Sequence, residues 1–71
     1  MKIISTTNVS REGTDCYIYE ELSLVEQFGV YAIISFYKVS DLTDQGELRI
    51  LYESNDYSKI MKKYCSLGGT I

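Results

Sequence analysis

The sequence contains no histidine, no proline and only two cysteines among its 71 residues. Without histidine the chain lacks the usual general base, the usual proton shuttle and the commonest metal ligand. Cys16 and Cys65 lie far apart and form no CxxC motif, and neither has a histidine partner that would activate a thiol. We expect two buried, apolar thiols, no enzymatic activity, no bound metal and no cofactor.

The carboxylates offer no catalytic or calcium-binding pattern either. Glu20 and Glu21 are adjacent, so on a strand they point to opposite faces and cannot share a substrate. Asp41, Asp44 and Glu47 lie near a glycine, but their spacing is not that of an EF-hand loop. A solvated loop is the expected structure there.

Positive charge and long apolar runs are also scarce. Seven basic residues against ten acidic ones give a net charge of −3, which argues against a nucleic-acid partner because phosphates require a basic surface. The first ten residues hold only two consecutive isoleucines, too few for a signal peptide, and no run reaches the length of a membrane span. We therefore expect a cytoplasmic, soluble protein that binds no membrane.

The length and the apolar content predict one small globular domain over residues 1–71. An apolar fraction of 45% is too high for a disordered chain. A domain of this size buries only about 60% of its unfolded surface, so its stability is marginal. Chains of this kind often gain stability by self-association.

Four β-strands are predicted from β-branched residues and alternating polarity, at 2–9, 16–22, 30–39 and 47–53. The polar residues around Gly13 predict a turn at 11–15, and segment 40–46 predicts a polar loop. Segment 23–29 allows a short helical turn, because Leu24 and Phe28 are four residues apart, or a hydrophobic hairpin loop. We favour the loop, because a single uncapped turn is weak.

A C-terminal helix is predicted after residue 56. Asn55 or Asp56 can serve as the N-cap, and Gly68 is suited to end the helix. The apolar stripe at i, i+3, i+4 and i+7 consists of Tyr57, Ile60, Met61 and Tyr64. The fold class is therefore α+β, a four-stranded antiparallel β-meander followed by one helix packed on one face of the sheet.

Strand 30–39 is apolar on both faces, although one helix can cover only one of them. We expect the face with Val30, Ala32, Ile34 and Phe36 to point inward, together with Ile18 and with Leu48, Ile50 and Tyr52 of the next strand. The second face is then the candidate interaction surface, formed by Tyr17, Tyr19, Tyr31, Ile33, Tyr37, Val39 and Leu51.

Seven tyrosines favour a solvent-exposed surface that can also bind another molecule, because each combines an apolar ring with a polar hydroxyl. Three interpretations stay open: tyrosines that merely pack well on a solvated sheet, a symmetric homodimer that buries the face, and docking of another protein. We expect a homodimer, with another protein as a further partner.

Residues 1–53 resemble small uncharacterised proteins of Gram-positive bacteria and their phages, through "MKIIS", the tyrosine-rich "CYIYEEL" and the strand "FGVYAIISF". The resemblance rests on pattern, without a diagnostic motif, and implies a cytosolic accessory protein without a defined activity.

The main functional hypothesis is a non-enzymatic protein–protein interaction module, such as a phage or mobile-element accessory protein that inhibits a host enzyme or defence complex. The alternative is a small-ligand-binding protein with an aromatic-lined cleft between sheet and helix.

Overall fold

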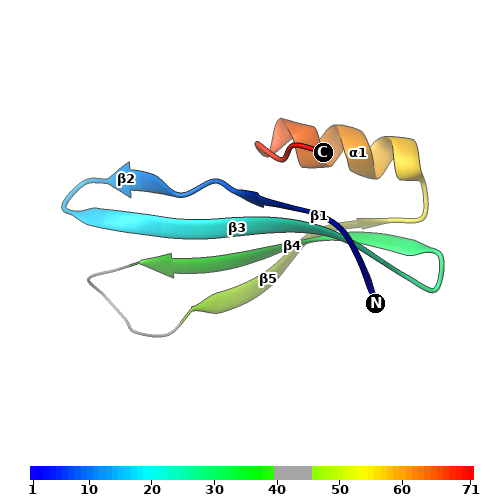
Figure 1. Cartoon of the computed structure of the whole chain (residues 1–71), viewed down its shortest axis with the longest axis horizontal. Coiled ribbons are helices and arrows are strands. Elements are labelled where there is room, and N and C mark those ends of the chain that lie inside the picture. The colour runs from blue at the N-terminus through cyan, green and yellow to red at the C-terminus, as the bar shows by residue number, and fades with distance from the viewer. Residues whose placement is uncertain (40–45) are drawn as a thin grey trace.

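The computed structural model describes residues 1–39 and 46–71. The elements are β1 (Lys2–Asn8), β2 (Arg11–Gly13), β3 (Cys16–Gln27), β4 (Val30–Val39), β5 (Glu47–Ser54) and α1 (Tyr57–Ser66). The strands pair antiparallel in the order β1-β3-β4-β5, and β2 pairs with β3 beyond the end of β1 (Figure 1). The predicted α+β fold with a C-terminal helix on one face is confirmed. Residues 40–45, where a polar loop is predicted, lie outside the described residues.

The predicted loop at 23–29 is wrong, because β3 continues to Gln27. Its residues 23–27 pair with residues 30–34 of β4, so the alternation of the strand runs on through Leu24. Only Phe28 and Gly29 form the turn, with φ angles of 54° and 78°. Positive φ at both central residues is the signature of a type I′ turn, which suits the twist of a two-residue hairpin.

The predicted turn at 11–15 is shorter than expected. Arg11 pairs with Ile18 and Gly13 with Cys16, so these residues belong to β2. The turn consists of residues 14 and 15, and Asp15 takes the left-handed conformation with φ 64°. Asp tolerates this conformation better than most residues, which is why the turn does not need the neighbouring glycine at its centre.

The helix begins and ends where the sequence predicts. The carboxylate of Asp56 accepts a hydrogen bond from the backbone N–H of Lys59 at 3.2 Å, which satisfies an otherwise unpaired donor of the first turn. Gly68 has φ 101° and follows the C-cap Leu67, as expected for a glycine that terminates a helix. The buried members of the predicted stripe are Ile60 and Tyr64.

Tyr64 joins the helix, the sheet and the C-terminal tail. Its ring is fully buried, and its hydroxyl donates to the carbonyl of Leu22 at 3.2 Å and lies 2.8 Å from the hydroxyl of Thr7. Gly69 lies against the ring, and a β-carbon there would approach a ring carbon to 2.4 Å. The N–H of Thr70 donates to Thr7 at 3.0 Å, so the tail packs along β1.

The helix packs on the face of the sheet that the residue pattern predicts to point outward. Leu22 pairs with Ser35, and Leu24 pairs with Ile33, so these residues share one face. The core is formed by Leu22, Leu24, Ile33, Ile60 and Tyr64. We call this side of the sheet the helix face and the opposite side the outer face. The predicted inward set Val30, Ala32, Ile34 and Phe36 therefore belongs to the outer face.

An irregularity in β5 also changes which residues share a face. Ile34 pairs with Ile50 and Ile33 with Tyr52, which leaves Leu51 as an extra residue between them. Leu48 and Ile50 therefore lie on the outer face, and Tyr52 lies on the helix face. The predicted common face for Leu48, Ile50 and Tyr52 is wrong, because an inserted residue reverses the alternation of a strand.

Candidate interaction surface

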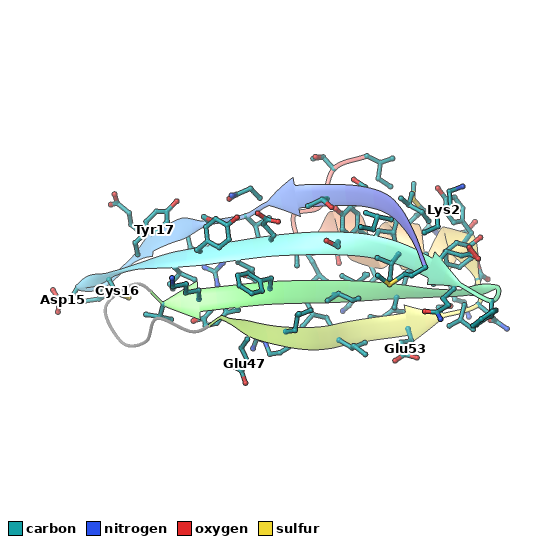
Figure 2. The ribbon with its side chains drawn as sticks, turned by 60° about the horizontal axis from the view of Figure 1, so that its bottom comes forward. Lys2, Asp15, Cys16, Tyr17, Glu47 and Glu53 are labelled. Atoms are coloured by element: carbon teal, nitrogen blue, oxygen red, sulfur yellow. The ribbon has the colours of Figure 1, made fainter. Side chains whose placement is uncertain are left out.

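Within residues 1–39 and 46–71, no helix packs on the outer face of the sheet. Figure 2 views the sheet with α1 behind it, so that the outer face is turned toward the reader. From the register of the strands, this face is formed by Ile3, Thr6 and Asn8 of β1, Tyr17, Tyr19, Glu21, Ser23, Val25 and Gln27 of β3, Val30, Ala32, Ile34, Phe36 and Lys38 of β4, and Leu48, Ile50 and Glu53 of β5. Most of its central positions are apolar.

Large aliphatic side chains are unusually exposed on this face. Leu48 is 69% exposed, Ile50 63% and Ile3 61%. Val25, between them on β3, is buried by its neighbours to 4%. Leu48 and Ile50 are neighbours on the edge strand β5, whereas Ile3 lies on the opposite edge strand β1. Single exposed apolar residues are ordinary, whereas a larger apolar patch marks a surface that contacts something else.

The outer face is hollowed near the β3–β4 turn. The hollow has a volume of about 410 Å³. Its lining is formed by Met1, Val25, Gln27, Phe28, Val30, Ala32, Ile34, Ile50 and Glu53. The lining is mainly apolar and draws on four segments of the chain, so that the hollow exists only in the folded sheet.

Phe28 projects from the tip of the hairpin beside this hollow and is 92% exposed. It also has a positive φ of 54°, which is a genuine outlier for a bulky residue. Such strain costs on the order of 1–3 kcal/mol and tends to be found at functional positions. Phe28 therefore presents an exposed and strained aromatic side chain at the hollow that it helps to line.

The other end of the outer face is aromatic. Tyr17 is 47% exposed there (Figure 2), and the rings of Tyr19 and Phe36 meet edge to face with centroids 6.2 Å apart. The hydroxyl of Tyr19 donates a hydrogen bond to the carboxylate of Glu21. That hydrogen bond, with further contributions from burial and from the negative charge of Glu21, raises the pKa of the Tyr19 hydroxyl.

The structure distributes the predicted interaction residues over both faces. Tyr17 and Tyr19 lie on the outer face, and the helix face carries Tyr31, Ile33, Tyr37 and Val39. Ile33 is fully buried in the core, so its side chain is not accessible to a partner. Leu51 is the extra residue of the β5 bulge and is 37% exposed. The predicted set is therefore not one continuous surface.

Sequence reasoning missed the most exposed members of the outer face. Leu48 and Ile50 were expected inward, and Ile3 and Phe28 were not singled out. The exposure of Leu48 and Ile50 depends on the bulge at Leu51, for which the sequence carries no glycine or proline signal. For Phe28 a signal existed, since the following Gly29 is a turn residue flanked by two strands.

A polar network occupies the part of the helix face that α1 does not reach. Glu20 is 8% exposed, and its carboxylate accepts hydrogen bonds from the Ser35 hydroxyl at 2.6 Å and from Arg11 at 2.8 Å. Arg49 lies 3.9 Å from the same carboxylate, and its guanidinium lies 4.7 Å from the centroid of the Tyr37 ring. The network satisfies a buried charge from three neighbouring strands.

These contacts decide the ionisation of Glu20. Burial acts to raise the pKa of its carboxyl group, but the hydrogen bonds from Ser35 and Arg11 and the positive charges of Arg11 and Arg49 outweigh it. The net effect lowers the pKa below the ordinary value of 4.5. The carboxylate is held ionised and fully engaged, which suits a structural group rather than a general acid.

A second hollow lies between the start of the helix and the sheet. It has a volume of about 410 Å³ and is lined by Lys2, Ile3, Ile4, Glu26, Tyr31 and Tyr57. The rings of Tyr31 and Tyr57 are 5.2 Å apart and tilted by 56°. This is the aromatic cleft that a small-ligand-binding function would require.

The described residues offer little for metal or thiol chemistry. Within 1–39 and 46–71, no three His, Cys, Asp or Glu residues come together to hold a metal ion. Both cysteines are free; Cys65 is exposed and Cys16 is half-buried, so the expectation of two buried thiols is wrong. None of the helices among the described residues is long and apolar enough to cross a membrane.

Comparisons of the chain with protein-family models, with curated proteins and with solved structures found no match.

The lowered pKa of Glu20 predicts a pH-dependent contribution to stability. That contribution is complete above pH 4.5, the ordinary value for an unfolded glutamate, and is lost as the pH falls through the lower folded value. We expect Glu20→Gln to reduce the free energy of unfolding at pH 7 by about 1–2 kcal/mol. The difference from the unmodified chain should shrink toward pH 3, as measured by urea denaturation.

Glu12→Gln provides the matched control, because it removes the same charge from an exposed position of β2. It should leave the free energy of unfolding at pH 7 nearly unchanged. A difference between Glu20→Gln and the unmodified chain that stays constant or grows on acidification would contradict the assignment.

The strained turn predicts that Phe28→Asn stabilises the fold. Asn adopts positive φ readily, and Asn-Gly is a preferred type I′ turn, so we expect a gain of about 0.5–1 kcal/mol. Little packing is lost, because Phe28 is 92% exposed. Urea denaturation of dilute protein measures the effect, with Gln27→Asn in the adjoining strand position as the control. A loss of stability in Phe28→Asn would show that the turn is not strained.

Proposed function

We propose that this chain is a non-enzymatic protein–protein interaction module that contacts its partner through the outer face of the sheet. The observation that carries the proposal is the exposure of Leu48 and Ile50, each more than 60% accessible on a face that no described element covers, with Ile3 equally exposed on the opposite edge strand. Burying such side chains against a partner is the main favourable contribution to association.

The character of the face favours a protein over a nucleic acid. Lys38 is the one basic side chain among the described residues of the outer face, and Glu21 and Glu53 are acidic. Tyr17 and Tyr19 could stack on bases, but phosphates would meet the carboxylate of Glu21 close by. An aliphatic centre with an aromatic end is typical of protein interfaces.

The small size, the net charge of −3 and an adhesive sheet face suit an accessory protein that acts by binding. In keeping with the resemblance of residues 1–53 to small proteins of Gram-positive bacteria and their phages, we place it with phage or mobile-element factors that inhibit a host enzyme or defence complex. Binding alone is the proposed mode of action, because the sequence has no histidine and the carboxylate next to the Ser35 hydroxyl is held ionised by Arg11 and Arg49.

Small-ligand binding is the second candidate, favoured by the cleft at Tyr31 and Tyr57. We place it second because Lys2 and Glu26, the charged residues of that cleft, are cross-strand neighbours of opposite charge. Their mutual attraction leaves little net charge to select a ligand.

Site-directed photo-crosslinking in the cells that produce the chain tests the proposal. A benzoylphenylalanine at position 50 should give covalent adducts with a protein on irradiation, because Ile50 is 63% exposed and lines the apolar hollow of the outer face. The same probe at position 62, an exposed lysine on the helix, is the matched control and should give few or none. Absence of protein adducts from position 50 would contradict the proposed function.

A further inference from the structure

We infer that the occupant of the outer face is a second copy of this chain, packed face to face about a two-fold axis. The inference rests on the proposed function, because it identifies the partner of the same surface. It is carried by two properties of the face: its area and the arrangement of its charges.

The area of the outer face matches what a stable dimer needs. Four strands about 4.8 Å apart are about 19 Å wide, and the ten residues of β4 extend about 33 Å, giving a face of about 600 Å². Two such faces bury about 1,200 Å² in total, which is the lower end of the range for specific, stable interfaces. The whole face, its polar positions included, thus reaches the area that self-association needs without a larger partner.

Face-to-face packing would also provide the layer that the fold lacks. Two sheets pack about 10 Å apart, with their inner side chains interdigitating into a shared core. Leu48, Ile50 and Ile3 from both copies would enter that core, and none of them carries a polar group that would be left unpaired. The dimer would therefore be a β-sandwich in which the two outer faces meet, and the helix face of each copy, with its helix, points away from the interface.

The charges of the outer face complement those of a second copy. Lys38 pairs with Tyr19 near one end of the face, and Glu53 pairs with Ala32 near the other. A two-fold axis across the strands superimposes opposite ends, so that Lys38 of each copy lies toward Glu53 of the other. In both copies the contact is between opposite charges.

The other possible axis also gives Lys38 an acidic partner. A two-fold axis along the strands, between β3 and β4, lays β4 of one copy over β3 of the other. Lys38 then lies over Tyr19 of the second copy, and Glu21 is two residues further along the same face. Either orientation of the dimer therefore requires the positive charge of Lys38 at the interface.

Sedimentation equilibrium from micromolar to millimolar concentration tests the inference. The unmodified chain should reach twice its monomer mass of 8.1 kDa. Ile50→Asp should raise the dissociation constant more than about 100-fold, because it buries a charge in both halves of the interface. Lys38→Glu should raise it about tenfold through like-charge repulsion. Circular dichroism would verify that both variants keep the fold, as expected for surface positions.

Charge exchange identifies the partner of Lys38. Adding Glu53→Lys to Lys38→Glu should restore the dimer if the axis crosses the strands, and adding Glu21→Lys should restore it if the axis follows them. Lys62→Glu on the helix is the matched control and should leave dissociation unchanged. Failure of both exchanges, or a dimer insensitive to Ile50→Asp, would overturn the face-to-face arrangement.

Sedimentation and crosslinking together distinguish a failure of the dimer from a failure of the proposed function. A monomer at every concentration would overturn the second copy as the occupant. If position 50 still formed adducts with a different protein in cells, the interaction function would stand without self-association. A monomer that also gave no adducts from position 50 would overturn both.

Discussion

In the part of the chain that the structure describes, the fold depends on one geometric constraint: a single ten-residue helix must cover a five-stranded sheet. Such a helix is about 15 Å long at 1.5 Å per residue, whereas the molecule extends 39 Å along its longest axis. It lies over the half of the sheet nearer the β3–β4 turn (Figure 1). Tyr64 concentrates the attachment at one point, with hydrogen bonds to β3 and β1 and a glycine of the tail against its ring. The sheet surface that the helix does not cover must be stabilised by other contacts.

The two surfaces that the helix leaves uncovered are accommodated differently. Beyond the helix, the helix face is finished by Glu20 with Arg11, Ser35 and Arg49, a network whose charges are paired and whose arginines reach water. The outer face has no comparable network among the described residues, and Leu48 and Ile50 stand exposed on its edge strand β5. A paired polar network therefore finishes the uncovered part of the helix face, and the described residues form no such network on the outer face. The partner that we propose would cover the apolar outer face, which the helix leaves open.

Features that depend on neighbouring residues in the sequence could be predicted, whereas features that depend on pairing between distant strands could not. The helix was found from its N-cap Asp56, its stripe and Gly68, all of which lie within one continuous segment. The strands were found from alternation, but their faces depend on pairing partners. Since β4 is apolar on both faces, only the register of Leu22 and Leu24 against Ser35 and Ile33 decides which side is inward. The bulge at Leu51 then exposes Leu48 and Ile50, and no local sequence feature announces it. The existence of a second apolar face was predictable; its residues were not.

Hydroxyl-radical footprinting of side chains tests the central claim, that the outer face is covered in solution, most directly. Ile50 and Ile71 make a matched pair, because they are 63% and 64% exposed in the single chain. The account predicts that Ile50 is oxidised much more slowly than Ile71 in concentrated protein, and that the two rates converge on dilution. Equal oxidation of Ile50 and Ile71 at every concentration, both in pure protein and in the cells that produce the chain, would contradict it.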